Sequence, residues 1–370
     1  MRVLIAPDCF GGTLSATEAA DAIALGWRRA APDDELVLRP LSDGGPGFVD
    51  VLHRALGGEL HEAMVRGPLD QYVSAVWLEH EDTGYIESAQ ACGLHLVEPE
   101  DRNPLESTTV GVGELIYEAH QFDMETIVVG LGGSASTDGG AGVFSGLNAD
   151  PLDTNDRVLL PLGGGALINC GRLASPVEIG DVRLIAASDV ENPLLGEHGA
   201  ARTFGPQKGA DELTVRKLER SLTHWADILA QAAGRDVRDE PGAGAAGGMG
   251  AALLALGATF ESGAGLVRRL TGLDEAMDQV DLVVSGEGSF DLQSLRGKLA
   301  ANVAAAAAER GLPCLVLAGQ VAVGGSEAAA AGVEKAYSVA EHAGSVRRSM
   351  ANPAGTLANL AADVAKQWRL

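Results

Sequence analysis

At both ends of this chain, short apolar runs end at glycine-containing turns. Helical patterns follow these turns. Residues 3–6 form the first run, Gly11-Gly12 the turn, and Ser15-Ala-Thr-Glu18 has the pattern of a capping box that opens a helix. An apolar run at 280–284 begins the same order again. Because strands that alternate with helices form parallel sheets, the two ends predict one doubly wound α/β domain.

The remaining elements divide between the ends and the middle of the chain. At the ends we expect strands at 35–41, 312–318 and 335–339 and helices at 48–56 and 298–310. In the middle we expect an antiparallel meander at 63–66, 73–80 and 84–87, strands at 126–130 and 182–187, and a helix at 214–233. Since 370 residues exceed what one core usually serves, we predict two domains. They are 1–60 plus 271–370, and an inserted domain at 61–270.

Charge and composition exclude several classes of protein. The net charge of −24 disfavours nucleic acid and anionic membranes as partners, because the long-range field repels both. The sequence has no apolar run of about 18 residues and no signal-peptide core, so we expect a cytoplasmic protein. The 4 cysteines and 8 histidines show no metal-ligand spacing, which favours reduced, mostly buried thiols and structural imidazoles.

Six loops combine glycine with an acidic or amide residue next to a predicted strand or helix. They are 8–12, 43–47, 132–140, 188–193, 205–209 and 285–293. Glycine lets backbone N–H groups approach phosphate oxygens closely, and carboxylates in the same loops can hold Mg²⁺. Loops at the carboxyl ends of parallel strands share one edge of the sheet, so we expect Asp8, Asp43, Glu287 and Asp291 to converge there.

Few side chains of this sequence can provide positive charge for a bound phosphate. Among the five lysines, only Lys208 and Lys298 lie in glycine-rich surroundings, so they are the first candidates for phosphate contact. The nucleotide-binding signature Gly-x-x-x-x-Gly-Lys-Ser/Thr is absent, no Gly-x-Gly-x-x-Gly follows the first strand, and Gly-x-Ser-x-Gly is missing. These absences disfavour phosphate-loop enzymes, dinucleotide enzymes and serine hydrolases.

The loop motifs as a set resemble those of a known family. In chain order they match the motifs of the bacterial glycerate kinases: Asp8-Cys-Phe-Gly-Gly-Thr-Leu-Ser-Ala, Leu41-Ser-Asp-Gly-Gly-Pro-Gly, Glu87-Ser-Ala-Gln-Ala-Cys-Gly-Leu, Gly130-Leu-Gly-Gly-Ser-Ala, Ala187-Ser-Asp-Val-Glu-Asn-Pro-Leu-Leu-Gly, Phe204-Gly-Pro-Gln-Lys-Gly-Ala, Gly242-Ala-Gly-Ala-Ala-Gly-Gly and Gly286-Glu-Gly-Ser-Phe-Asp-Leu-Gln-Ser-Leu-Arg-Gly-Lys. The resemblance covers almost the whole chain. It implies a flavodoxin-like domain built from both chain ends, interrupted by a restriction-endonuclease-like mixed α/β domain.

The resemblance also implies an activity. Members of this family transfer the γ-phosphoryl group of MgATP to a hydroxyl of D-glycerate, in a cleft between the domains. We expect catalytic roles for Asp43, Asp189, Asp291 and Lys298, with Asp189 and Asp291 as Mg²⁺ ligands. Contacts to ATP or glycerate are expected from Asp8, Gly132, Gly133, Ser134, Lys208, Gly247, Glu287 and Gln293. A homodimer stays open as the assembly.

The chain departs from the family pattern in its reactive loops. Cys9 and Gly11 stand where serine and lysine are usual, Pro46 stands for glutamate, and Thr137 stands for asparagine. Phosphoryl transfer depends mostly on positioning and charge neutralisation, so a missing lysine can cost several kcal/mol in the transition state. Three hypotheses therefore remain: a working kinase of glycerate or a similar hydroxy acid, a relative with another substrate or reaction, or a non-catalytic nucleotide- or metabolite-binding protein.

Overall fold

The computed structural model describes residues 1–174, 177, 179–296 and 299–368. The chain separates into two compact units. Unit 1 comprises Met1–Ser42, Asp50–Leu56 and Ala264–Leu370, and unit 2 comprises Asp43–Val49 and Gly57–Gly263. Both chain ends therefore contribute to unit 1, and the short segment Asp43–Val49 belongs to unit 2 although its neighbours on either side do not.

Unit 1 contains a five-stranded sheet in the order β13-β12-β11-β1-β2, in which every neighbouring pair is parallel. Its strands are β1 (Arg2–Pro7), β2 (Glu35–Leu38), β11 (Leu282–Phe290), β12 (Cys314–Val321) and β13 (Lys335–Ser338). The prediction of a parallel α/β sheet formed by both chain ends is thereby confirmed. Strand β1 is an interior strand, between β11 and β2, and both faces of its Val3–Ala6 run are apolar and buried.

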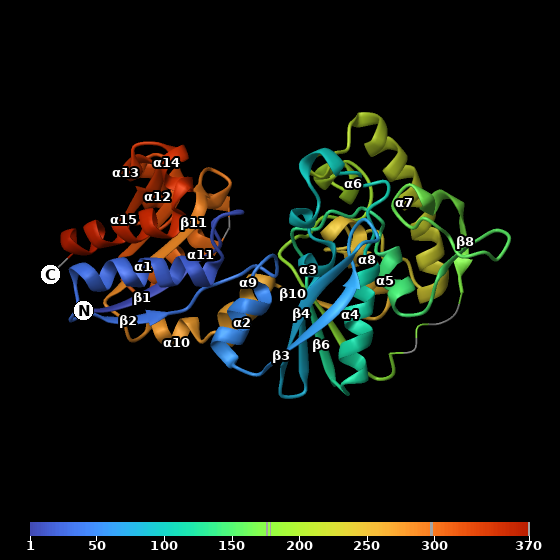
Figure 1. Ribbon diagram of the computed structural model, residues 1–370, viewed down its shortest axis with the longest axis horizontal. Coiled ribbons are helices and arrows are strands. Elements are labelled where there is room, and N and C mark those ends of the chain that lie inside the picture. Colours follow the sequence, from blue (N-terminus) through green and yellow to red (C-terminus); the bar gives the residue numbers. More distant parts are fainter. Residues whose placement is uncertain (175–176, 178, 297–298, 369–370) are drawn as a thin grey trace. The chain divides into compact units, whose positions relative to one another are not determined.

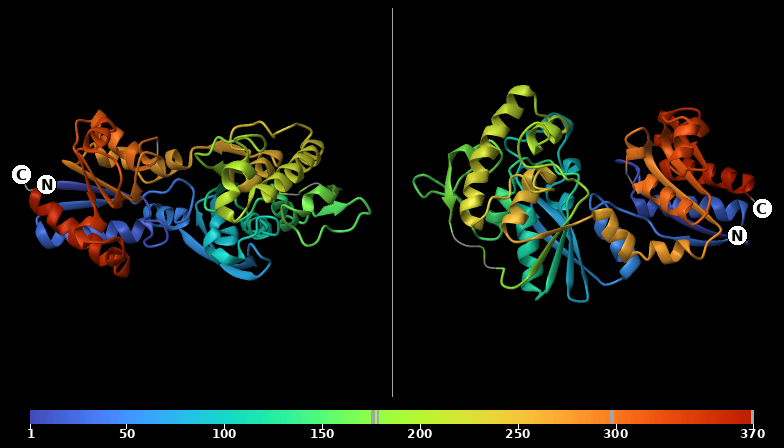
Figure 2. Two further views of the ribbon diagram at one scale, coloured as in Figure 1. Left: turned by 90° about the horizontal axis from the view of Figure 1, so that it is seen from above. Right: turned by 180° about the vertical axis from the view of Figure 1, so that it is seen from behind.

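Helices cover both faces of this sheet (Figure 1, Figure 2). The helices of this unit are α1 (Ala16–Ala30), the part of α2 (Phe48–Leu56) from Asp50 on, α9 (Gly263–Leu270) from Ala264 on, α10 (Leu273–Met277), α11 (Leu299–Glu309), α12 (Gly325–Ala330), α13 (Val339–Ala343), α14 (Val346–Ala351) and α15 (Pro353–Gln367). Helices α1 and α15 lie side by side on one face, where alternate strand residues such as Val3, Ile5 and Val284 join their core. Helix α11 packs against β11 and β12 from the opposite face.

The start of α1 follows the predicted chemistry. Ser15 accepts a hydrogen bond from the backbone N–H of Glu18, and the Glu18 carboxylate accepts one from the backbone N–H of Ser15. This reciprocal pair satisfies two N–H groups that the first helical turn leaves without a partner. The capping box that the sequence predicts is therefore confirmed.

Strand β11 corrects one prediction. We expected a strand at 280–284 followed by a loop, but β11 runs on to Phe290. The extension is paired: Glu287 lies opposite Ala318 and Ser289 opposite Gln320 of β12. Glycine permits this close pairing, because a Cβ at Gly286 would lie 2.4 Å from the carbonyl oxygen of Leu317. Glycine here marks a close approach of two strands instead of a turn.

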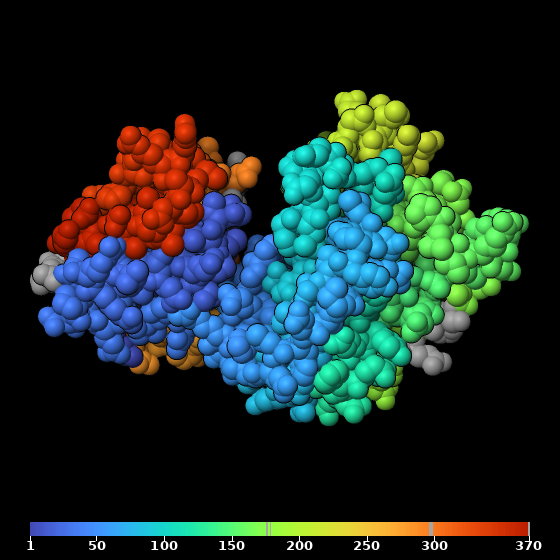
Figure 3. All heavy atoms as spheres, viewed as in Figure 1, coloured from blue at the N-terminus to red at the C-terminus, as the bar shows by residue number. Residues whose placement is uncertain are grey.

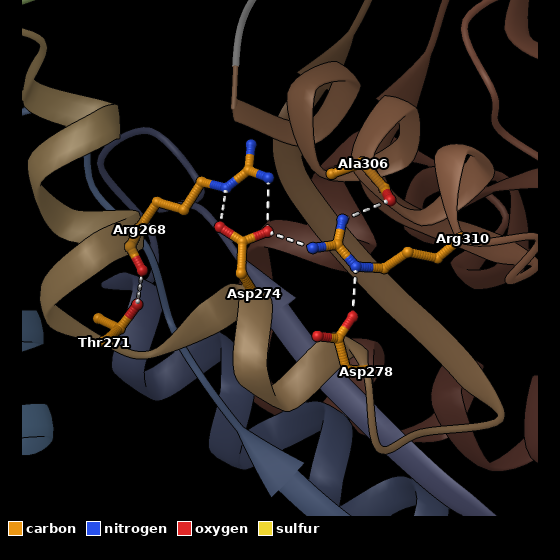
Figure 4. A network of polar contacts seen from close by, with 6 residues as sticks. All are labelled: Arg268, Thr271, Asp274, Asp278, Ala306 and Arg310. Atoms are coloured by element: carbon orange, nitrogen blue, oxygen red, sulfur yellow. Dashed lines mark hydrogen bonds and ion pairs between the residues drawn. The ribbon is translucent and has the colours of Figure 1, made fainter.

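An ionic network ties three helical segments of unit 1 together (Figure 4). Arg268 of α9 donates two hydrogen bonds, of 2.7 and 2.6 Å, to the carboxylate of Asp274 on α10. Arg310, just after α11, donates to Asp274 at 2.8 Å and to Asp278 at 2.8 Å. The Asp274 side chain is 38% exposed. Its arginine partners, Arg268 first, lower the pKa of Asp274.

Unit 2 is built on a six-stranded sheet in the order β10-β9-β6-β5-β4-β3. The strands are β3 (Glu59–Arg66), β4 (Tyr72–His80), β5 (Thr83–Glu87), β6 (Thr126–Gly130), β9 (Arg183–Ala187) and β10 (Thr259–Glu261), and a separate hairpin contains β7 (Pro151–Asp153) and β8 (Cys170–Leu173). Strands β3 to β5 are antiparallel, as predicted, and the pairs from β5 to β10 are parallel. The hairpin (green) projects from the surface of this unit (Figure 3).

Two layers of helices lie over one face of this sheet. The helices of unit 2 are α3 (Ser88–Cys92), α4 (Val110–Gln121), α5 (Ala141–Gly146), α6 (Ala200–Phe204), α7 (Glu212–Ala233) and α8 (Ala245–Ala255). Helices α4, α5 and α8 share a core with alternate strand residues such as Trp77, Ile127 and Leu184. Helix α7 contributes Leu218 and Trp225 to a second core farther from the sheet, together with α6 (Figure 2). This arrangement holds the loops after β5, β6 and β9 at one edge of the sheet.

The cysteines and the helix lengths bear on two more expectations. Cys92, Cys170 and Cys314 are buried, Cys9 is half-buried, and none of these four described cysteines is in a disulfide. Burial raises the pKa of Cys92 and of Cys314 to about 12, which keeps both protonated and unreactive at neutral pH. In the part of the chain that the structure describes, every helix is too short or too polar to span a membrane.

Candidate active site

The loop 43–47 of unit 2 is closely packed at its glycines. The Oδ1 atom of Asp43 accepts a hydrogen bond of 3.0 Å from the N–H of Gly45. A Cβ at Gly44, whose φ is 95°, would lie 2.5 Å from the carbonyl oxygen of Ala187 at the end of β9. Asp43 itself is exposed. The glycines therefore bring the loop against the sheet edge and leave the Asp43 carboxylate at the surface.

A buried carboxylate that we had not assigned a role fixes this loop. Glu87, at the end of β5, is 4% exposed and accepts hydrogen bonds from the N–H groups of Gly47 (3.0 Å) and Val49 (3.4 Å). These donors lie at the start of α2, where a carboxylate is favoured. Burial raises the pKa of Glu87, and the hydrogen bonds oppose that shift. The only feature of the sequence that pointed to Glu87 was its place in the motif Glu87-Ser-Ala-Gln-Ala-Cys-Gly-Leu.

The loop after β6 packs face to face with the loop 43–47. A Cβ at Gly132 would lie 2.6 Å from the Cα of Gly45, and one at Gly133, whose φ is 64°, would lie 2.9 Å from Cγ of Pro46. Only glycine fits at such distances. The two predicted glycines and the substituted Pro46 therefore form one contact between loops that are far apart in the sequence.

Lys208 lies beneath the loop after β6. Its side chain is buried, with 2% of the residue exposed, and its Nζ donates to Ser134 Oγ at 2.9 Å and to the carbonyl oxygen of Ser136 at 2.5 Å. Burial lowers the pKa of Lys208 to about 8, and the nearby Asp138 opposes that shift. Most of these ammonium groups are still charged at pH 7. The predicted phosphate lysine thus places a positive charge directly under Ser134.

Asp138 anchors the far end of the same loop. It is fully buried and accepts hydrogen bonds from the backbone N–H (2.9 Å) and hydroxyl (2.8 Å) of Thr109 and from the N–H groups of Gly140 (3.1 Å) and Gly142 (3.2 Å). Burial raises its pKa against the effect of these donors. Next to it, the buried Thr137 hydroxyl has no hydrogen-bond partner among the described residues. The usual asparagine of the family would stand at that position.

Gly247 meets this loop from the α8 side. The residues 246–248 have positive φ values, and a Cβ at Gly247 would lie 2.0 Å from the carbonyl oxygen of Ser136. Gly247 is buried. The structure shows that Gly247 packs against the loop 132–136, and its predicted contact with a ligand stays a prediction.

Asp189, in the loop after β9, is exposed and lies close to the segment that also contacts Asp43. Its Oδ1 accepts a hydrogen bond of 2.5 Å from the hydroxyl of Ser262. The adjacent Gly263 is so near the loop 43–47 that a Cβ there would lie 1.9 Å from the carbonyl oxygen of Asp43. Asp43 and Asp189 therefore flank the same dipeptide. Two of the three predicted catalytic aspartates therefore belong to loops that pack against one segment of unit 2.

The other predicted acidic residues belong to unit 1. The N–H of Asp8 donates to the carbonyl oxygen of Gly286 at 2.8 Å, which holds the loop after β1 beside β11. Glu287, on β11, is 5% exposed. Asp291 follows the same strand, and its Oδ1 accepts from the N–H groups of Gln293 (2.8 Å) and Ser294 (3.1 Å). Asp291 thus caps the 3-10 helix Ser294–Arg296.

Some predicted site residues are not brought together by these observations. Asp291, Glu287, Asp8 and Gln293 are in unit 1, whereas Asp43 and Asp189 are in unit 2. Convergence of all these side chains therefore stays a prediction. Lys298 lies outside the described residues.

The acidic residues can be tested for their fit to Mg²⁺. In the described ranges, no group of three or more histidine, cysteine, aspartate or glutamate side chains is arranged to hold a metal. Mg²⁺ typically takes only one or two carboxylates and completes its shell with phosphate oxygens and water. The exposed carboxylates of Asp43 and Asp189 fit a metal that is carried by a polyphosphate, and they do not form a closed protein site.

Comparison with known proteins agrees with this set of loops. The family model described as "Glycerate kinase family" matches residues 3–369. The glycerate 2-kinase of Escherichia coli K12 is 42% identical over 327 residues, which cover 87% of this chain and 86% of the relative. The glycerate kinase of Halalkalibacterium halodurans is 42% identical over 328 residues, with 87% and 86% covered.

A solved structure is similar over nearly its full length. It is the crystal structure of a protein from Salmonella typhimurium LT2 that is provisionally assigned as glycerate kinase 2, and its TM-score is 0.80. The two sequences are 36% identical, and the alignment covers 99% of this chain and 98% of that one. With a family model along almost the whole chain and close relatives of the same name, the chain belongs to the glycerate kinase family.

Proposed function

We propose that this chain is an ATP-dependent kinase that transfers the γ-phosphoryl group to a hydroxyl of D-glycerate or a related small hydroxy acid. Relatives named glycerate kinase or glycerate 2-kinase are 40–42% identical to it over 87% of the chain. The sheet order of unit 1, β2-β1-β11-β12-β13, is that of flavodoxin-like domains, which supports the proposed fold. We propose the domain limits 1–60 plus 271–370 and 61–270, with a restriction-endonuclease-like inserted domain.

The observation that carries this function is the buried Lys208 under the loop 132–136. Phosphoryl transfer needs fixed positive charge and N–H dipoles near anionic oxygens, because the protein contributes positioning and electrostatic stabilisation. Lys208 is held by two hydrogen bonds and excluded from solvent, so it needs no reorganisation when an anion binds. Its charge at Ser134 supports an anion site for a phosphate or for the substrate carboxylate. The backbone of Gly132 and Gly133 then lies at the same site.

The acidic residues have the complementary role. As the substrate hydroxyl oxygen forms its bond to the γ-phosphorus, the bond from that phosphorus to the bridging oxygen of ADP breaks. The hydroxyl proton then passes to a carboxylate oxygen, for which we propose Asp43, since it is exposed and its Oδ1 is oriented by Gly45. Asp189 is oriented by Ser262, and the following residue, Gly263, packs against the backbone of Asp43. Asp291 and Lys298 complete the catalytic set that we propose.

Asp189 and Asp291 are the residues that would hold Mg²⁺, which would neutralise charge on the phosphate oxygens. Asp8, Glu287 and Gln293 would contact nucleotide or acid. A cytoplasmic location and a homodimer are further parts of the proposal.

The test is a coupled assay of ADP release with D-glycerate, with the product identified by phosphorus NMR. We expect turnover by the wild type and a loss of about 100-fold or more in kcat for Asp43→Asn, because the proton acceptor is lost. Asp50→Asn, an exposed carboxylate on α2, is the control and should keep full activity. ADP release that does not depend on the acid, or equal rates for both variants, would contradict the proposal.

Gly11→Lys decides between the working kinase and the alternatives. No atom lies within 4 Å of a Cβ at Gly11, and its φ is not positive, so the fold accommodates a lysine there. If the wild type does not turn over and Gly11→Lys does, the chain has abandoned the family reaction. Thermal-shift measurements with ATP and small hydroxy acids then distinguish a new substrate from pure binding.

A further inference from the structure

Unit 1 contains a pocket of about 320 Å³ that is lined by none of the residues assigned above to catalysis, to the metal or to ligand contacts. It opens where β1, β11 and β12 end, next to α14 and the start of α15. Three glycines, Gly11, Gly288 and Gly319, line one side. A Cβ at Gly288 would lie 3.2 Å from the N atom of Gly11, and one at Gly319 would lie 2.5 Å from the carbonyl oxygen of Gly288. These backbones therefore pack into a continuous wall free of side chains.

The opposite side of the pocket is apolar and open to solvent. Val346 and Met350, one turn apart on α14, are 39% and 57% exposed. Phe10 and Leu357 are buried beneath them, at 5% and 1% exposure. Apolar side chains held at the surface around a cavity are unfavourable in water and mark ligand sites. The occupant should therefore offer an apolar face.

The polar groups of the pocket restrict the occupant further. No residue that lines it, among those the structure describes, carries a charge. The hydroxyls of Thr13 and Ser349 already donate to the carbonyl oxygens of Phe10 and Val346, whereas Ser289 and Gln320, which also line the pocket, are exposed. A glutamine amide both donates and accepts. A pocket without charged side chains favours a neutral ligand, such as a flat heterocycle with a polar edge, over a phosphate or a carboxylate.

The position of the pocket agrees with this chemistry. Strand β2, which follows β1 in the sequence, lies on one side of β1 in the sheet. The later strands β11, β12 and β13 lie on its other side. In open parallel sheets, ligands bind at such a reversal of strand order, outside the carboxyl ends of the strands. The volume lies in the lower part of the range of about 300–1,000 Å³ found for small-molecule sites.

We propose that this pocket receives the adenine base of the nucleotide. This inference rests on the proposed kinase function, for which ATP is the only reactant with a neutral, flat, heterocyclic part. The apolar side chains of α14 cover one face of the base, the glycine wall leaves room for the other, and Gln320 hydrogen-bonds its polar edge.

The experiment places a negative charge at the rim of the pocket. Met350→Glu changes a 57% exposed residue, and Leu25→Glu, on α1 of the same unit and 60% exposed, is the matched control. MgADP and adenosine are the probes, and their dissociation constants are measured by calorimetry. We expect Met350→Glu to weaken both at least about tenfold, because the carboxylate must be desolvated against the base, and Leu25→Glu to change neither. Gln320→Ala should reduce the preference for ATP over GTP.

The outcomes separate this inference from the proposed function. If the wild type phosphorylates glycerate but both glutamate variants bind MgADP and adenosine equally well, the pocket assignment is overturned while the function stands. If the wild type is inactive with glycerate and Met350→Glu still loses adenosine binding, the pocket assignment stands alone. A wild type that binds neither probe overturns the inference. So does a dimer, seen by sedimentation, that Met350→Glu dissociates without any change in MgADP binding.

Discussion

Two aspartates, one in each unit, show how differently a satisfied carboxylate can behave. Asp138 of unit 2 has 0% exposure, and its donors are backbone N–H groups and the hydroxyl of Thr109. Asp274 of unit 1 has a side chain that is 38% exposed, and its donors are two guanidinium groups. The pKa of Asp138 is raised by burial, whereas the pKa of Asp274 is lowered by Arg268 and Arg310.

The two carboxylates differ in their access to water. A buried polar network forms strong interactions in a low dielectric, but each missing partner leaves a desolvated group behind. At the surface, water replaces a lost partner at little cost. The candidate anion site, built on Asp138 and Lys208, should therefore be rigid and intolerant of change. The ionic network around Asp274 should tolerate substitution.

Asp138→Ala should have the largest effect on stability. It leaves the Thr109 hydroxyl and the N–H groups of Gly140 and Gly142 without an acceptor, and it removes the negative charge that stabilises buried Lys208. Breaking a buried charged network costs about 3–5 kcal/mol. Urea unfolding measures this as a lowered midpoint. Asp181→Ala, an exposed carboxylate of the same unit, should change the free energy of unfolding by less than about 0.5 kcal/mol.

Lys208 tests the same site by titration. Its folded pKa of about 8 lies below the value of about 10.4 for an unfolded lysine, so the unfolded state binds the proton more tightly. The buried charge therefore destabilises the fold fully below about pH 8, and stability is regained as the pH rises toward about 10.4. Relative to Lys208→Met, the wild type should gain roughly 3 kcal/mol across this window.

Chemical unfolding at pH 7.5, 9 and 10.5 measures the difference between the two proteins. Lys217→Met, an exposed lysine on α7, should show no such window. A wild type and a Lys208→Met variant whose stabilities run in parallel across this range would show that the ammonium is solvated, and the anion site would lose its main support.

Local chemistry made much of the fold predictable. The capping box at Ser15 and Glu18 is formed by residues three apart, and the β3 to β5 meander follows from alternating patterns and turns. The sequence indicated Lys208 as a candidate for phosphate contact but did not indicate its burial. A lysine flanked by glycines indicates an exposed loop, but here the packing around Pro206–Lys208 buries it.

Residues that act through distant partners were missed for the same reason. Glu87 receives its donors from Gly47 and Val49, and Asp138 receives two from Thr109, roughly 30 to 40 positions away in each case. Nothing in a local pattern indicates such pairs. The loop that we predicted at 285–290 was wrong for another reason. Glycine is equally suited to a turn and to the close approach of β11 and β12.

Asp274→Asn should have the smallest effect and so completes the contrast with Asp138. Its side chain is 38% exposed, and surface ion pairs contribute about 0–1 kcal/mol, so we expect a loss below about 1 kcal/mol that shrinks in high salt. Because its folded pKa is depressed, the contribution is fully present above about pH 4 and is lost as the pH falls through the folded pKa. Thermal unfolding at low and high salt, with Asp21→Asn at the exposed Arg54 pair as the reference, measures it. A loss as large as that of Asp138→Ala would mean that the ionic network of unit 1 is shielded from water, and burial would no longer explain the difference between the two aspartates.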